Sequence, residues 1–310
     1  MVRCVLLFAM VFTANSVFGK VRPKVIYGAD NRVELTNTQT MFENLGRATA
    51  ALVRDEALVL DSSGRGYTIA PNVKTLKESL RLCSKERFAN QPFLASCSGF
   101  LVAENIMVTA GHCYQGMMNT ACDNHAWVFD YKLEDETRPF SFSFPKENVY
   151  RCKRVLKSVL SSSDRGDYSI IELDRKVTDR TPVQFRRSGA IKVGEKVTVI
   201  GHPWGLPSKV AEGGKVLHAD QAQYFTTNLD TFQGNSGSAV FNSSTGVVEG
   251  ILVRGRSDAL MTFGSAEGVC RTLNVCNEDG SSCSVKDENS KGEDVSRMTI
   301  VAAELEKLGL

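Results

Sequence analysis

The sequence of 310 residues has little net charge, no second long apolar run and no closely spaced cysteine pair. Lys and Arg number 37 against 35 for Asp and Glu, which excludes the basic surface typical of proteins that bind nucleic acid or anionic membranes. After the first residues, no apolar run is long enough to span a bilayer, so we expect no membrane anchor. The lack of a C-x-x-C pair argues against zinc, and we expect no metal.

Residues 1–19 have the pattern of a secretory signal peptide. Arg3 gives a positive start, Val5 to Phe12 are apolar, and Val17 and Gly19 precede a cleavage point before Lys20. We therefore predict an exported protein, secreted or periplasmic. Residues 20–24 would form a short propeptide, and its removal would expose Val25.

Eight cysteines remain when Cys4 is removed with the signal peptide, and an even number in an exported protein indicates disulfides. Cys97 and Cys113 bracket an expected hairpin and form one predicted pair. Three of the other six precede residue 153 and three follow residue 269, so full pairing requires at least one bridge between these groups. The six are Cys83, Cys122, Cys152, Cys270, Cys276 and Cys283.

Short strand-like segments separated by polar turns predict an all-β chain of barrels or a sandwich. Apolar residues at helical spacing near the end predict a helix over 293–310, with Glu293 and Asp294 at its positive end. The expected strands are 48–53, 98–102, 106–110, 126–131, 149–156, 168–173, 183–186, 196–201, 209–218, 223–228, 238–241 and 247–253.

Three separated motifs contain residue types suited to nucleophilic catalysis. TAGHC ends at Cys113 and contains His112, and DTFQGNSGSAVF contains Ser236. Asp167 stands directly before an alternating strand, where an aspartate can fix one imidazole nitrogen and leave the other as a base. Asp164 and Asp174 are the rival acids, one in a serine-rich loop and one at the far end of the strand.

In the order His, Asp, Ser, these motifs resemble the chymotrypsin-fold serine peptidases. VIYGADNRVEL, DTFQGNSGSAVF and VVEGILVRG are similar to the bacterial branch that includes the glutamyl endopeptidases, over about Val25 to Gly255. The resemblance implies two antiparallel six-stranded β-barrels and a C-terminal helix. Residues 25–178 would form the first barrel and residues 179–292 the second. The order of the motifs, and Ser238 in place of a glycine, argue against an α/β-hydrolase.

The resemblance implies a serine endopeptidase that acts on protein or peptide substrates as a monomer, without a cofactor. Ser236 would attack the carbonyl, His112 would accept its proton, and Asp167 would orient His112. The N–H groups of Gly234 and Ser236 would form the oxyanion hole.

The resemblance leaves substrate specificity open. Asp230 precedes Ser236 by six residues, where trypsin-like enzymes carry the acid that binds Arg or Lys, and this favours a basic P1 side chain. Thr231 and Arg254 would instead suit an acidic P1 side chain, although Leu252 replaces the histidine of the glutamyl endopeptidases. Asn235 replaces the aspartate that receives the new N-terminus in animal enzymes, which argues against activation by that route.

Two other classes of function remain open. A catalytically silent homologue would act as a secreted protein-binding module and would keep the fold without activity. A disulfide-rich adhesion or structural module would use the region from Cys270 to Cys283 and the charged segment after it. Both readings predict that Ser236 is unreactive.

Overall fold

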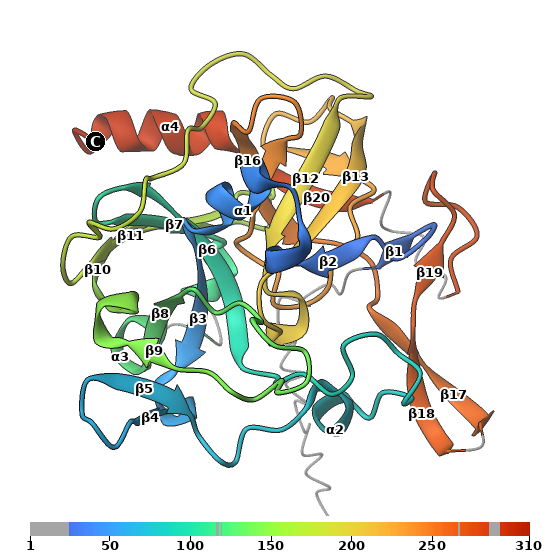
Figure 1. Cartoon of the computed structure of the whole chain (residues 1–310). Helices are drawn as coiled ribbons and strands as arrows, with labels where there is room; N and C mark the ends of the chain where they lie inside the picture. Colours follow the sequence, from blue (N-terminus) through green and yellow to red (C-terminus); the bar gives the residue numbers. More distant parts are fainter. Residues whose placement is uncertain (1–24, 116–117, 119, 266, 285–291) are drawn as a thin grey trace, which may run out of the picture.

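The computed structural model describes residues 25–115, 118, 120–265, 267–284 and 292–310. Within them the chain forms two barrels of antiparallel strands, followed by a C-terminal helix (Figure 1). The predicted signal peptide and propeptide, residues 1–24, lie outside the described residues. No helix among the described residues is long and apolar enough to cross a membrane.

The first barrel is a closed ring of six strands in the order β10-β11-β7-β6-β3-β8. Trp127 is fully buried in it and donates its indole N–H to the Tyr114 hydroxyl at 3.0 Å. Gly99 faces this indole, and a Cβ there would lie 2.6 Å from the ring. The strands are β3 (Thr49–Arg54), β6 (Ala95–Ala103), β7 (Ile106–Thr109), β8 (His125–Phe129), β10 (Val149–Leu160) and β11 (Asp167–Leu173).

Shorter elements from the first half of the sequence lie outside the two rings of strands. A small sheet contains β4, β5 and β9, and it packs through the apolar residues Leu58 and Phe144. The elements are α1 (Thr40–Gly46), β4 (Leu58–Leu60), β5 (Gly66–Ile69), α2 (Leu76–Leu80), α3 (Ala121–Asn124) and β9 (Phe144–Pro145).

The second barrel also has six strands, in the order β12-β15-β16-β20-β14-β13, and pairing of β13 with β12 closes it. The strand β2 (Arg32–Glu34) pairs with β13 outside this ring. The six strands are β12 (Lys196–Gly201), β13 (Lys209–His218), β14 (Tyr224–Thr227), β15 (Ala239–Asn242), β16 (Val248–Arg254) and β20 (Glu293–Arg297). A hairpin of β17 (Ala259–Ser265) and β18 (Gly268–Leu273) extends from it (Figure 1).

The described structure differs from the expected boundaries at both ends of the chain. β1 (Ile26–Tyr27) pairs with β19 (Val275–Cys276), and β2 pairs with β13, so the start of the chain belongs to the second barrel. The expected helix over 293–310 is shorter: α4 covers Met298–Lys307. Residues 293–297 are instead β20, because their backbone groups pair with β14 and β16.

The expected strand 183–186 makes only an isolated bridge, between Phe185 and Val248. The apolar side of α4 packs as the spacing predicts, since Met298, Val301 and Leu305 are buried. These three residues belong to an apolar cluster that includes side chains of both barrels. This cluster therefore joins the two barrels.

Four disulfides connect all eight cysteines that follow Cys4. Cys97 and Cys113 are joined, which is the predicted pair. The required bridge between the early and late cysteines is Cys83–Cys270, across 187 residues of sequence. The other two are Cys122–Cys152 and Cys276–Cys283.

Candidate active site

His112 and Asp167 are brought together by two neighbouring elements of the first barrel. His112 lies in a 3₁₀ turn, Gly111–Cys113, directly after β7, and Asp167 begins β11. His112 Nδ1 lies 3.0 Å from Asp167 Oδ2, and the His112 backbone N–H donates to Oδ1 at 3.1 Å. Gly111 permits this approach, because a Cβ there would overlap the Val159 carbonyl oxygen at 1.9 Å.

The rival acids have other partners. Asp164 accepts the Gly166 backbone N–H, and Asp174 lies against Arg175. Asp167 is the one that contacts His112, and it is 1% exposed. Burial alone would raise the pKa of Asp167, but the charges of His112 and Arg254 and the hydrogen bonds from His112 lower it below its usual value. Asp167 is therefore ionised at neutral pH.

Ser236 is positioned by a serine of the other barrel. The Ser98 backbone N–H donates to the Ser236 carbonyl at 2.8 Å, and Ser98 Oγ donates to the Gly234 carbonyl at 2.8 Å. The same Oγ accepts the His202 backbone N–H at 2.9 Å. Buried Ser98 thus fixes both carbonyls around the candidate nucleophile. Ser98 is not among the site residues predicted from the sequence. The only feature of the sequence that points to it is its position next to Cys97.

The N–H groups expected to bind an oxyanion are available. Gly234 has a φ of 93°, and a Cβ there would lie 2.5 Å from the His202 carbonyl oxygen, so this position requires glycine. The Trp204 backbone N–H donates to the Gln233 carbonyl. The Gly234 N–H belongs to the same planar peptide group as this carbonyl and points in the opposite direction, away from Trp204. Among the described residues, the N–H groups of Gly234 and Ser236 donate to no protein acceptor.

A cleft of about 820 Å³ contains His112, Gly234 and Ser236 in its lining. The other lining residues are a mixture of apolar and polar side chains, and they come from both barrels and from the segments between strands. The hydrogen bonds of the described residues include none between Ser236 Oγ and the His112 ring, and such contacts are often long in ligand-free sites. The apolar members of the lining are Ala57, Val73, Phe93, Leu94, Ala95, Met118, Leu160 and Trp204.

Asp230 lies outside the cleft, whereas binding of a basic P1 side chain would require it to line the cleft. Its carboxylate accepts the backbone N–H of Tyr27 at 2.7 Å and of Asn31 at 3.0 Å. It is 1% exposed and is absent from the cleft lining. Burial raises the pKa of Asp230 to about 7, against the lowering by these two hydrogen bonds. Asp230 therefore anchors the start of the chain, which the sequence assigned to the first barrel.

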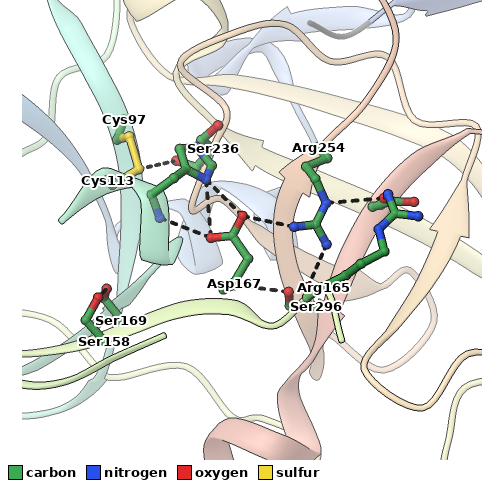
Figure 2. A network of polar contacts seen from close by, with 11 residues as sticks. Cys97, Cys113, Ser158, Arg165, Asp167, Ser169, Ser236, Arg254 and Ser296 are labelled. Atoms are coloured by element: carbon green, nitrogen blue, oxygen red, sulfur yellow. Dashed lines mark hydrogen bonds and ion pairs between the residues drawn. A yellow bond between two sulfur atoms is a disulfide. The ribbon is translucent and has the colours of Figure 1, made fainter. Parts of the chain in front are cut away.

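The other three specificity candidates are also outside the cleft lining. Thr231 Oγ1 donates to Glu293 Oε2 at 2.6 Å, and Leu252 is fully buried in the core of the second barrel. Arg254 lies beside Asp167, with its Nη1 3.2 Å from Asp167 Oδ2 (Figure 2). Because all three lie outside the cleft lining, none of them is placed to contact an acidic P1 side chain.

Cys97, His112 and Cys113 bring three potential metal ligand atoms within 4.8 Å of one another. Both sulfur atoms are joined in the Cys97–Cys113 disulfide, so neither is a thiolate. The cluster therefore does not fit a metal ion. The disulfide instead fixes the turn that carries His112.

Residues 97–251, half of the chain, match the family model of the trypsin-like peptidase domain. The chain is 31% identical over 132 residues to a probable periplasmic serine endoprotease DegP-like protein of Pseudomonas savastanoi, and 25% identical over 166 residues to an uncharacterized protein of Sinorhizobium fredii. These alignments cover 40% and 49% of this chain but 27% and 24% of the relatives. The chain thus spans about a quarter of the length of these curated relatives.

Solved structures similar to this chain include a Glu endopeptidase in complex with MPD, with a TM-score of 0.49 and 14% identity, over 92% of this chain and 100% of that chain. A serine endoprotease from Yersinia pestis gives a TM-score of 0.46 and 13% identity, over 86% of this chain and 65% of that chain. The family match includes His112, Asp167 and Ser236. The chain belongs to the trypsin-like peptidase family.

Proposed function

We propose that this protein is a serine endopeptidase in which Ser236 is the nucleophile, His112 the general base and Asp167 the residue that orients His112. The observation that carries the proposal is the contact of His112 Nδ1 with buried Asp167, beside a cleft that contains Ser236. The Asp167 carboxylate favours the tautomer in which Nδ1 carries the proton. The Nε2 lone pair is then the one that accepts the proton of Ser236.

The reaction follows from these roles. Ser236 Oγ bonds to the substrate carbonyl carbon while His112 Nε2 takes the hydroxyl proton, and the carbonyl oxygen becomes an anion. The N–H groups of Gly234 and Ser236 stabilise this anion, and one such donor contributes about 10²–10³ in rate. His112 returns the proton to the leaving amine, and the peptide bond breaks. Water then hydrolyses the acyl-enzyme with His112 as base, which restores Ser236.

The disulfides indicate an oxidising compartment outside the cytoplasm. We propose that the protein is secreted or periplasmic, in keeping with the predicted signal peptide and with the name of the Pseudomonas savastanoi relative. Its substrates are proteins or peptides, as the family implies. A monomer is the expected form.

Reaction of the full chain, expressed with export, with a fluorophosphonate probe tests this proposal. We expect a stoichiometric adduct on Ser236, detected by mass spectrometry of the peptides. Ser236→Ala should abolish it, and His112→Ala should slow it by at least about 10³. Ser243→Ala is the matched control, since Ser243 bonds to the Thr198 hydroxyl at 2.9 Å away from the cleft lining. Absence of any adduct would favour the catalytically silent homologue.

A further inference from the structure

Arg254 is a largely buried cation at the end of β16, and its guanidinium group contacts three acceptors. Its Nη1 lies 3.2 Å from Asp167 Oδ2, and its Nη2 donates to the Arg165 carbonyl at 2.7 Å. Its Nε lies 3.4 Å from Asp294 Oδ2. The side chain is 17% exposed and takes no part in the cleft lining, so it is not a substrate-binding group.

The contacts of Arg254 with Asp167 and Arg165 cross from one barrel to the other. Asp167 belongs to β11 of the first barrel, whereas Arg254 belongs to β16 of the second, the barrel that carries Ser236. Ser296, on β20, adds a second link by donating its hydroxyl to the Asp167 carbonyl oxygen at 3.0 Å (Figure 2). Both the side chain and the backbone of Asp167 are therefore held by the second barrel.

Arg254 shares one oxygen of Asp167 with the candidate base. His112 Nδ1 contacts Oδ2 at 3.0 Å, and Arg254 Nη1 contacts the same atom at 3.2 Å. A carboxylate with a fixed cation on its far side attracts a newly formed imidazolium less strongly than a bare carboxylate does. The same cation prevents the carboxylate from rotating away from His112.

We propose that Arg254 is a positioning residue of the catalytic site, which holds the Asp167 carboxylate against His112 and sets the lower limit of the pH range in which His112 acts as a base. This inference rests on the proposed function, because it assigns the base to His112. It names a role that the sequence did not suggest, since Arg254 was a candidate for substrate specificity.

The charged groups around this contact come from four elements. His112 faces Asp167 from the 3₁₀ turn, and Arg254 faces it from β16. Asp294 of β20 faces Arg254 and also pairs with Arg165, which precedes β11, at 2.5 Å. Removal of Arg254 therefore leaves Asp167 more attractive to an imidazolium, and removal of the Asp294 charge does the opposite.

Two measurements across the histidine titration range test the proposal. One is NMR titration of the His112 ring, in a chain that has only four histidines, and the other is the rate of labelling by the fluorophosphonate probe. Arg254→Met should raise the pH midpoint of both by about one unit and slow labelling at its plateau about tenfold. Arg254→Lys keeps the charge, so its midpoint should stay near that of the unaltered protein.

Asp294→Asn provides a second variant whose effect has the opposite sign. It should lower the midpoint, because the charge of Arg254 is then less compensated. Arg186→Met is the matched control, since Arg186 pairs with Glu249 on the same strand β16 without contacting Asp167. It should leave both midpoints unchanged.

The outcomes separate the two proposals. Equal midpoints in Arg254→Met, Asp294→Asn and the unaltered protein would overturn the role of Arg254, even if labelling is efficient. A shifted ring titration in a protein that is not labelled at all would support the role of Arg254 at the site while overturning the serine endopeptidase.

Discussion

The two barrels differ in the number of carboxylates that they bury. Apart from Asp167, the carboxylate buried on the first barrel is Glu172, and its partners Lys153 and Arg154 are exposed to solvent. The second barrel and the segment β2 packed on it bury several carboxylates, which contact cations, hydroxyls or backbone N–H groups. These are Glu34, Asp230, Glu249, Asp258, Glu293 and Asp294.

This difference indicates which interactions stabilise each barrel. The first barrel is held mainly by apolar packing around Trp127 and by disulfides within it, neither of which changes with pH. The second barrel relies on charges that must be paired once they are removed from water. We therefore expect the second half to respond more strongly to pH and to loss of single charged groups.

The largest expected effect comes from the disulfide that links segments attached to the two halves. Cys83–Cys270 closes 187 residues, and chain entropy assigns it about 5 kcal/mol, against about 3 kcal/mol for Cys97–Cys113 across 16 residues. Replacing both members of each pair by Ala should lower the free energy of unfolding in this order. Denaturant titration measures both, and the reverse order would mean that residual structure in the unfolded chain dominates.

Asp230 should make stability fall as pH rises. Burial raises the pKa of Asp230 to about 7 in the folded state, so between about pH 4 and pH 7 the folded protein keeps a proton that the unfolded chain releases. The stability contributed by this proton is fully present below about pH 4 and is lost towards pH 7, by at most about 4 kcal/mol. Asp230→Asn should remove this fall in unfolding experiments at several pH values.

Asp135 provides the control for Asp230 on the side of the first barrel. Hydrogen bonds from Thr137 and Arg138 lower the pKa of half-buried Asp135 to about 2. Asp135→Asn should therefore leave the fall between pH 4 and pH 7 in place. If both variants gave the same pH profile, the contrast between the barrels would not hold.

The smallest expected effects come from removing the charge of one buried carboxylate in each half and comparing the loss of stability. Glu34 contacts buried Lys209 at 2.8 Å and accepts the Gln91 amide at 2.7 Å. Burial lowers the pKa of Lys209 to about 8 even beside Glu34. Glu34→Gln should cost about 3 kcal/mol, because it leaves this cation without a counter-charge. Glu172→Gln should cost much less, because its partners Lys153 and Arg154 are exposed to solvent.

A second change separates charge from shape at the Glu34 site. Adding Lys209→Met to Glu34→Gln removes the unpaired cation, while Gln91 keeps an amide as its partner. We expect most of the lost stability to return, as measured by the denaturant midpoint. No recovery would indicate that packing at residue 34, and not charge, sets the cost.

The strand-like segments predicted the all-β class, and eleven of the twelve expected strands match observed ones within a few residues. Their alternation is local and regular, as in Tyr168 to Leu173. The two barrels followed from the resemblance of the motifs to the chymotrypsin-fold serine peptidases. Pairing of Cys97 with Cys113 followed from a hairpin of local residues. The same locality explains why Asp167 was preferred over Asp164 and Asp174.

The features that could not be predicted from the sequence depend on contacts between distant segments. Glu293 and Asp294 resemble the acidic start of a helix, and only pairing with β14 and β16 makes them a strand. Asp230 stands at the position of a specificity residue, yet Tyr27 and Asn31, about 200 residues earlier, occupy its oxygens. Arg254 reaches Asp167 across 87 residues of sequence, a contact with no local signal.

The position of β20 also sets the order in which the molecule can be completed. All six strands of the first barrel lie between residues 49 and 173, so this barrel can close as soon as that stretch has emerged. The second barrel also needs β20 at residues 293–297, which follows all of these strands in the sequence. Because β20 carries both Ser296 and Asp294, contacts that fix Asp167 and Arg254 form only after the first barrel can close. A nascent chain thus holds its candidate base and nucleophile without the support that aligns them until β20 has emerged.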